Sequence, residues 1–226
     1  MASYSGPSLP SGLVTCIDVS NQKGYSGSTV INLADGTLNF SGNSGYINST
    51  RITSGSPFVT SSTSILDTDT HSIFFKIKFN TSGTYPSGTS GNWEKIFSFN
   101  APGSDRSPSI WRWPSERTLH WRYDPSNSGC DFGKTAGGTG NPFDLDTWYF
   151  VGVTKNGGST AMYVNGVQVG TGSVSSPKTP GSAAIQIFQS YGGASADFNN
   201  LYIFNRTLSS TEVSELFRII RPQLGI

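Results

Sequence analysis

The sequence predicts an all-β fold of two packed antiparallel sheets, with one short helix near the C-terminus. Three observations lead to this prediction. Gly accounts for 27 of the 226 residues and Ser, Thr and Asn are abundant, which is typical of many tight turns between short strands. Charged residues make up 13%, about half the roughly 25% of an ordinary globular protein. Several segments alternate apolar and polar residues with a period of two, and one late segment has helical spacing.

In the first half of the chain, strands are expected at residues 13–19, 29–33, 37–40, 71–80 and 94–99. The segment 71–80 has the clearest alternation. One of its faces is expected to lie against the core and carries Ile73, Phe75, Ile77 and Phe79. Its other face is expected to be wetter and carries Phe74, Lys76 and Lys78.

A three-stranded meander is expected from residue 148 to residue 170. Asn165 and Gly166 tolerate the positive φ of both central positions of a type I′ turn, so they predict a two-residue hairpin. Such a turn pairs Val164 with Val167 and Met162 with Val169, and places all four on one dry face. Residues 148–153 are apolar on both faces, which indicates a central strand with both faces at least partly covered.

Later elements follow from turn and capping signals. Strands at 110–113 and 118–123 flank a turn that contains Pro114, and final strands are expected at 185–189 and 200–205. Residues 81–92 and 124–141 are interpreted as long loops. A capping box of Ser209 and Glu212 begins the helix, and Pro222 ends it. Val213, Leu216, Phe217 and Ile220 follow at helical spacing and are expected to form its apolar face.

We therefore expect one domain at residues 13–220, an N-terminal arm at 1–12 and a C-terminal tail at 221–226. The arm has three sizeable apolar residues, too few to offset the backbone entropy of ordering it. Arm and tail are thus expected to contact other subunits rather than their own core, with assembly contacts at Tyr4, Leu9 and Pro10. The two cysteines, Cys16 and Cys130, are expected to be unpaired.

Three segments carry a family resemblance. WYFVGVTKNG, MYVNGVQV and DFNNLYIFNRTLSSTEV, in this order, resemble the laminin-G-like branch of the concanavalin A-like lectin/glucanase jelly rolls. The resemblance covers roughly residues 12–217 and implies a two-sheet antiparallel jelly-roll sandwich. The opening GLVTCIDVSNQKGY is similar to the first strand of bacteriophage structural proteins that carry such domains. These motifs are more specific for the fold than for the function.

The densest aromatic and cationic stretch is SIWRWPSERTLHWRYDP. A sugar ring has an apolar face and a polar rim, so an aromatic platform with nearby hydrogen-bond donors can bind it. The candidate carbohydrate-binding residues are Trp111, Arg112, Trp113, His120, Trp121, Arg122 and Tyr123. A second interpretation stays open, in which the Trp face is core and the Arg/His face is ordinary surface or a subunit interface.

No catalytic residues, metal ligands or cofactors are expected. Glycoside hydrolases of this fold use carboxylates in a Glu-x-Asp-x-x-Glu pattern, and the four glutamates here do not form it. Two histidines without a nearby cysteine do not predict a zinc site. The Asp-x-Asp pairs at residues 67–69 and 144–146 could suit calcium, but are expected to cap strand entries. A glycoside hydrolase is therefore the least expected of the functions considered.

The expected function is a non-enzymatic virion surface protein of a bacteriophage, either a capsid decoration or a tail-fibre component, with a role in attachment. Its partners would be other virion proteins, copies of itself and surface glycans. The alternative is a carbohydrate-binding, lectin-like module. A net charge of +1 gives no reason to expect nucleic acid, and no apolar run is long enough for membrane insertion. The first residues lack a signal-peptide pattern, so synthesis in the host cytoplasm and location in the virion are expected.

Overall fold

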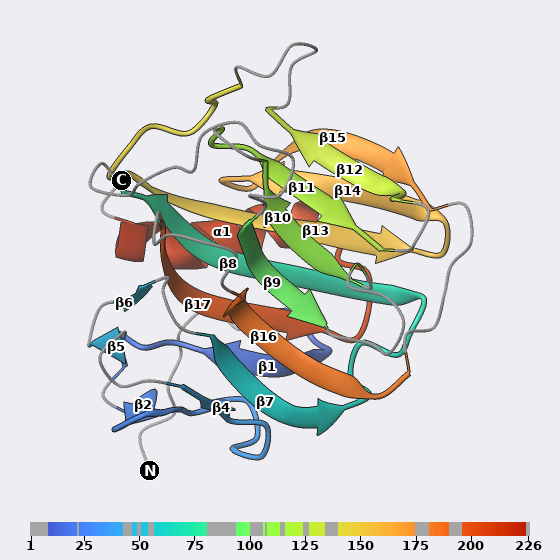
Figure 1. The fold of residues 1–226 in the computed structure, drawn as a ribbon. Helices are drawn as coiled ribbons and strands as arrows, with labels where there is room; N and C mark the ends of the chain where they lie inside the picture. Colours follow the sequence, from blue (N-terminus) through green and yellow to red (C-terminus); the bar gives the residue numbers. More distant parts are fainter. Residues whose placement is uncertain are drawn as a thin grey trace.

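Two antiparallel sheets face each other across an apolar interior in the computed structural model (Figure 1). Seventeen strands and one α-helix are formed by the residues that the structure describes. These residues are 9–21, 23–42, 47–48, 51–53, 57–80, 94–99, 106, 108–113, 116–123, 127–133, 140–174, 181–189 and 196–224.

The back sheet contains the longest strands. Its order is β1 (Leu13–Ile17), β17 (Ala196–Phe204), β8 (Thr70–Phe79), β13 (Trp148–Asn156), β14 (Ser159–Val164) and β15 (Val167–Ser173). The two short strands β5 (Ile47–Asn48) and β6 (Arg51–Thr53) attach to β17. β8 lies at the centre because it pairs along its length with both β13 and β17.

The front sheet faces the back sheet. Its order is β7 (Phe58–Thr63), β16 (Ala183–Gln189), β9 (Glu94–Phe99), β10 (Ser109–Arg112), β11 (Leu119–Arg122) and β12 (Gly129–Phe132). Beyond β7 it continues into β4 (Phe40–Ser41), β3 (Thr29–Val30) and β2 (Tyr25–Ser26).

The two sheets join at one edge, so that they form a single curled sheet. Gly129 of β12 pairs with Ser173 of β15. The backbones approach so closely here that a Cβ on Gly172 would lie 1.9 Å from the Gly129 carbonyl oxygen. Glycine at position 172 is therefore required by the close approach of the two strands.

The apolar side chains form two clusters. The larger cluster fills the space between the sheets and includes the predicted core face of β8, Ile73, Phe75, Ile77 and Phe79. The second cluster lies on the outer face of the back sheet, beneath helix α1 (Ser210–Ile220), which lies behind β8 and β13 in Figure 1. It contains Phe74, Phe150, Tyr163, Tyr202, Phe204, Leu208, Val213, Leu216, Ile220 and Leu224.

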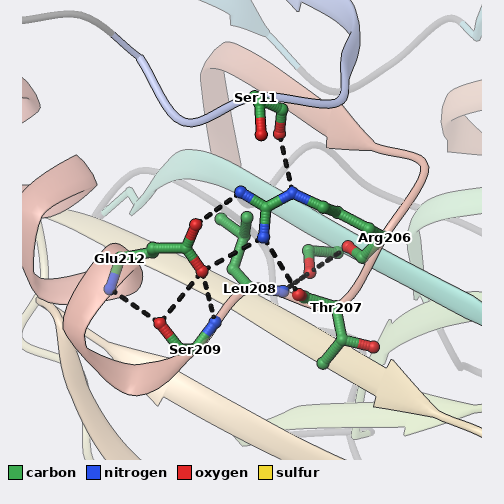
Figure 2. Close-up of polar contacts among 7 residues, drawn as sticks. Ser11, Arg206, Thr207, Leu208, Ser209 and Glu212 are labelled. Atoms are coloured by element: carbon green, nitrogen blue, oxygen red, sulfur yellow. Dashed lines mark hydrogen bonds and ion pairs between the residues drawn. The ribbon is translucent and has the colours of Figure 1, made fainter.

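The start of α1 is fixed by the predicted capping box (Figure 2). The backbone N–H of Glu212 donates to Ser209 Oγ at 3.3 Å, and the backbone N–H of Ser209 donates to Glu212 Oε2 at 2.9 Å. Arg206 holds the same carboxylate through both terminal nitrogens and donates from Nε to the Ser11 carbonyl at 3.0 Å. This hydrogen-bonded ion pair lowers the pKa of Glu212 to about 2. The segment before the helix is thereby fastened to the residues that precede β1.

The predicted fold class is confirmed, as are several of its elements. The helix spans Ser210–Ile220, and a short 3-10 helix, Arg221–Leu224, follows it. The strand at residues 94–99 has the predicted bounds. Asn165 and Gly166 have φ of 49° and 79°, as the hairpin prediction requires. The expected domain boundaries stay a prediction.

Two details of the predicted strand faces are wrong. Val164 pairs with Val167 as expected, but a bulge after Met162 pairs this residue with Gly170 in place of Val169. Val167 is 65% exposed, so the four residues do not share a dry face. The predicted wetter face of β8 is largely covered, since Phe74 lies beneath α1 and Lys76 is buried with its Nζ 5.3 Å from the centre of the Trp148 ring.

The expectation that arm and tail avoid their own core is also wrong for the described residues. Leu9 packs against the cluster beneath α1, and Leu224 of the tail belongs to that cluster. Pro10 and Leu9 line a groove of about 630 Å³ beside the helix. Tyr4 lies outside the described residues. Contacts of these segments with other subunits stay a prediction.

The cysteines are unpaired, as predicted. Cys130 is buried and Cys16 is half-buried. Burial is the main cause that raises the pKa of Cys16 to about 11 and that of Cys130 to about 12. Among the described residues, no helix has the length and apolar character needed to cross a membrane.

Candidate functional site

The aromatic hairpin singled out in the sequence lies in the front sheet, as strands β10 and β11. The antiparallel register pairs Trp111 with His120 and Ile110 with Trp121. Paired residues project to the same side of a sheet. The side with Ile110 faces the interior, because Ile110 and Trp121 belong to the larger apolar cluster. Trp111 and His120 therefore lie on the outer face of the front sheet.

The seven candidate residues divide between these two faces. Four share the outer face, namely Trp111, Trp113, His120 and Arg122. The other three, Arg112, Trp121 and Tyr123, are buried on the interior side, so they are not part of the outer surface; sugar binding by any of the seven stays a prediction. This division follows from the register, which places the tryptophans of β10 opposite the histidine and arginine of β11.

Arg112 has a structural role in the interior. Its side chain is fully buried, and Nε donates to Glu94 Oε2 at 2.8 Å. Nη1 donates to the carbonyl oxygens of Trp113 and Glu116. These bonds compensate the burial of the guanidinium, which would otherwise be costly. The alternative interpretation, in which the Trp face is core and the Arg/His face is surface, holds for β11, where Trp121 faces the interior and His120 and Arg122 face outward. It does not hold for Trp111 and Trp113, which lie on the outer side.

A hydrogen-bonded chain of three side chains crosses the outer face from β11 to β12. His120 Nδ1 lies 2.5 Å from Asp131 Oδ1, and Arg122 Nη2 lies 2.8 Å from Asp131 Oδ2. Arg122 also donates to Asn127 Oδ1 and to the carbonyls of Trp121 and Cys130. Each nitrogen of the guanidinium is thus used within the protein.

The protonation states in this chain follow from burial and hydrogen bonding. Burial alone would raise the pKa of Asp131, but the hydrogen bonds from His120 and Arg122 outweigh it and lower the pKa to about 2. Burial lowers the pKa of His120 more than its contact with Asp131 raises it. At neutral pH a neutral His120 therefore donates from Nδ1 to an ionised Asp131, since a carboxylate can only accept.

Within the group of Trp111, Trp113, His120, Arg122 and Asp131, two residues reach solvent. Trp113 is half-buried, and its ring meets His120 edge-on with 5.4 Å between ring centres. Asp131 has 32% of its side chain exposed. In contrast, Trp111 is buried and donates from Nε1 to Ser109 Oγ at 2.6 Å, while the Nζ of the buried Lys95 lies 4.7 Å from its ring centre. The accessible part of the face therefore combines an indole with an anionic hydrogen-bond acceptor.

Sequence reasoning missed Asp131, because it falls in the segment 124–141 that was interpreted as a loop. Residues 129–132 instead form β12, which pairs with β11. The signal was a short alternation, in which Cys130 and Phe132 are apolar and contact the interior cluster while Asp131 is polar. Four residues next to two glycines give too weak a pattern to predict a strand.

The donor groups of the described residues do not form a metal site. Within the described ranges, no three His, Cys, Asp or Glu side chains gather where they could hold an ion. Asp131 instead accepts hydrogen bonds from His120 and Arg122, which are its neighbours on the outer face. Chemically, this face offers an aromatic surface and hydrogen bonds to an uncharged polar ligand.

These features define a jelly-roll domain in which a helix covers one outer face and a polar, aromatic surface occupies the other. A family model of the concanavalin A-like lectin/glucanases superfamily, of the laminin-G type, matches residues 53–214. The chain belongs to this superfamily, as the resemblance implied. A search of curated proteins finds no sequence match.

Solved structures share the fold at low sequence identity. A Trypanosoma rangeli sialidase in complex with sialic acid aligns with a TM-score of 0.67 and 16% identity, over 97% of this chain and 35% of the sialidase chain. The botulinum neurotoxin serotype C1 binding domain aligns with a TM-score of 0.64 and 15% identity, over 91% of this chain and 51% of that chain. The chain thus spans about a third to a half of the length of these proteins.

Proposed function

We propose that this protein is a carbohydrate-binding domain that uses the outer face of the front sheet. The observation that carries the proposal is the half-exposed Trp113 beside His120, which is in turn hydrogen-bonded to Asp131. An indole can stack on the apolar face of a sugar ring, and a carboxylate can accept hydrogen bonds from sugar hydroxyls. Membership of a lectin and glucanase superfamily supports the same function by analogy only.

The proposal is for binding without hydrolysis. Two carboxyl groups about 5–10 Å apart are needed on either side of a glycosidic bond for the usual mechanisms. Glu94 is paired with Arg112 on the interior side, Glu116 is buried, and Glu212 is held by Arg206. Among the described residues, Asp131 is the carboxylate that contacts His120, the neighbour of Trp113, and it has no second carboxylate as a hydrogen-bond partner.

The test is binding to an immobilised panel of oligosaccharides, with two matched tryptophan variants. Trp113→Ala removes the indole from the outer face of the front sheet. Trp148→Ala removes a half-buried indole from the outer face of the back sheet. We expect Trp113→Ala to weaken binding about tenfold or more, as truncation of a central aromatic contact does, and Trp148→Ala to leave it unchanged.

Two results would overturn this proposal. One is that no glycan of a broad panel binds the folded protein at millimolar concentration. The other is that both tryptophan variants bind as the unchanged protein does. Release of sugar from any bound glycan would contradict the non-hydrolytic part, and a matched Asp131→Asn variant would then identify whether this carboxylate is responsible.

A second candidate function is a surface component of a bacteriophage virion, either on the capsid or on a tail fibre. The observation that favours it is the opening segment of residues 12–25, which is similar to phage structural proteins. Glycan binding and a place on a virion are compatible, since an attachment protein needs both. Assembly contacts would then involve the N-terminal arm, with the virion as the location.

The structure shows which residues of the arm should be kept in a test of this second candidate. Removal of residues 2–8 spares Leu9, which packs beneath α1, and Ser11, whose carbonyl accepts from Arg206. The shortened protein should keep its melting temperature but lose incorporation into particles or oligomers. Normal incorporation would contradict a role of these residues in assembly. A Leu9→Ser variant is the control, because it should lower stability through the chain's own cluster.

A further inference from the structure

The outer face of the front sheet contains both positive and negative side chains, and they differ in their access to a ligand. Arg122 is only 7% exposed, and its nitrogens donate to Asn127, Trp121, Cys130 and Asp131. Lys95 is 1% exposed. Neither cation therefore presents its charge to a molecule that arrives from solvent.

Among the charged side chains that the structure describes on this face, the anionic one is reached by solvent. Asp131 has 32% of its side chain exposed. A carboxylate has about four acceptor positions on its two oxygens. Within the described structure one position of each oxygen is used, by His120 on Oδ1 and by Arg122 on Oδ2. The remaining positions can accept hydrogen bonds from a ligand.

This difference in access determines which ligands fit. A ligand must donate hydrogen bonds to Asp131, because an ionised carboxylate cannot donate. A second negative charge close to Asp131 would be repelled in a partly desolvated site. Two neighbouring hydroxyls match the two oxygens of a carboxylate held in a fixed orientation, and Arg122 and His120 fix the orientation of Asp131 from the protein side.

We propose that the ligand of this face is a neutral sugar, which donates two neighbouring hydroxyls to Asp131 and lays its apolar face on Trp113, and that acidic sugars are excluded. This inference rests on the proposed carbohydrate-binding function and names its substrate class. The pKa of Asp131, lowered to about 2, keeps the acceptor ionised at neutral pH. Selectivity then arises from one exposed anion, Asp131, whose cationic partner Arg122 is buried.

The experiment compares matched neutral and acidic glycans on the unchanged protein. The probes are lactose with 3′-sialyllactose, and a neutral tetrasaccharide of galactose with the corresponding tetragalacturonate. We expect each neutral probe that binds to do so at least about tenfold more tightly than its acidic counterpart, which corresponds to about 1.4 kcal/mol. Added salt should change the binding of the neutral probes very little, since no charge is paired on binding.

The Asp131→Asn variant tests the role of the carboxylate. It should bind neutral sugars at least about tenfold less tightly than the unchanged protein does. The difference in affinity between neutral and acidic probes should also become smaller. The Arg218→Ala variant is the control, because Arg218 is exposed on α1, which lies on the back sheet. Circular dichroism of both variants verifies that each is folded, and the comparison of probes on the unchanged protein does not depend on any variant.

The outcomes separate the two proposals. If acidic probes bind as tightly as neutral ones or more tightly, and Trp113→Ala abolishes this binding, the carbohydrate-binding function stands and the inferred selectivity is overturned. If no probe of either kind binds, the proposed function itself fails. If neutral probes bind selectively but Asp131→Asn binds them equally well, Asp131 is not the acceptor and the inference is also overturned.

Discussion

The two outer faces of the sandwich are made by similar strands but are completed in different ways. The outer face of the back sheet is covered by the chain's own helix, and the side chains between them are apolar. The outer face of the front sheet carries Trp111, Trp113, His120, Arg122 and Asp131, linked by hydrogen bonds and ring contacts. Both faces belong to one continuous curled sheet.

The two outer faces therefore have different roles, since one contributes stability and the other offers polar groups for recognition. Beneath α1, each fully buried large apolar side chain contributes about 1.5–3 kcal/mol, without any need for a specific partner. On the front sheet, buried polar groups are stable only where they are hydrogen-bonded, so Arg122 and His120 require Asp131. Residues beneath α1 can therefore be replaced by apolar residues of similar size. Residues on the front sheet cannot be replaced so freely, because they depend on particular hydrogen-bonded partners.

The largest effect is expected on the covered face. Leu216→Ala removes a fully buried side chain from beneath α1 and leaves a cavity. We expect a loss of about 2–5 kcal/mol in the free energy of unfolding. Urea denaturation followed by tryptophan fluorescence measures it. Trp113→Ala, on the other face, should cost less, because its side chain is half-buried and leaves no closed cavity. If Trp113→Ala lost more unfolding free energy than Leu216→Ala, the covered face would not be the one that contributes more to stability.

Sequence alone predicts the covered face better than the polar face. The reason is that the interactions that determine the covered face join residues close together in the sequence. The start of α1 follows from Ser209 and Glu212, which are three residues apart, and the β14–β15 hairpin follows from Asn165 and Gly166. Alternation along one strand likewise identifies the interior face of β8. In each case the residues that determine the structure are close in sequence.

The polar face depends on pairing between strands, which local patterns do not specify. The tryptophans of β10 meet His120 only because of the register with β11. Asp131 joins them because β12 pairs with β11 and crosses close to β15, where Gly172 leaves room for the backbone. Lys76 is buried because Trp148 of the neighbouring strand lies beside it. Four of the seven candidate residues lie on this face, but Asp131, which links two of them, could not be predicted from the sequence.

The second prediction concerns the pH dependence of the polar face. The pKa of Asp131 is lowered from 3.8 to about 2, so its ionised form stabilises the fold at neutral pH. We expect Asp131→Asn to cost about 2 kcal/mol or more at pH 6, given about 1.4 kcal/mol for each pKa unit and the buried Arg122 that loses its ion-pair partner. Because the folded pKa is the lower one, this contribution should be complete above about pH 4 and should vanish as pH falls through about 2.

The measurement is the difference in stability between the unchanged protein and Asp131→Asn at a series of pH values. The difference between the two proteins removes the contribution of His71, which both proteins share. His71 lies in the interior, and its pKa is lowered to about 3, mainly by burial and then by Lys155. As pH falls below about 6.5 the unfolded chain protonates at His71 before the folded one does, so both proteins lose stability. A difference that stays constant from pH 6 to pH 2 would show that Asp131 makes no stabilising ion pair.

A smaller effect is expected at the start of the helix that covers the back sheet. Ser209→Ala removes the hydroxyl that accepts from the Glu212 backbone N–H. Loss of such a cap costs about 1 kcal/mol. The Arg206–Glu212 pair remains and keeps the segment in place, so thermal denaturation should show one cooperative transition at a slightly lower temperature. Ser209→Thr, which keeps a hydroxyl that can accept from the Glu212 N–H and donate to the Glu212 carboxylate, should restore stability. If it does not, the cap is not what the hydroxyl supplies.

The smallest effect is expected at the solvent side of the same helix. Arg218 Nε lies 2.8 Å from Glu215 Oε2, but both side chains are more than half exposed, at 64% and 55%. Exposed ion pairs three residues apart on a helix contribute only about 0.3–0.5 kcal/mol, and salt screens them. Arg218→Ala should therefore change the unfolding free energy by less than about 0.5 kcal/mol, and less still in 1 M salt. A loss comparable to that of Leu216→Ala would mean that the stability of the covered face depends on surface charge, and the division of roles between the two faces would then be wrong.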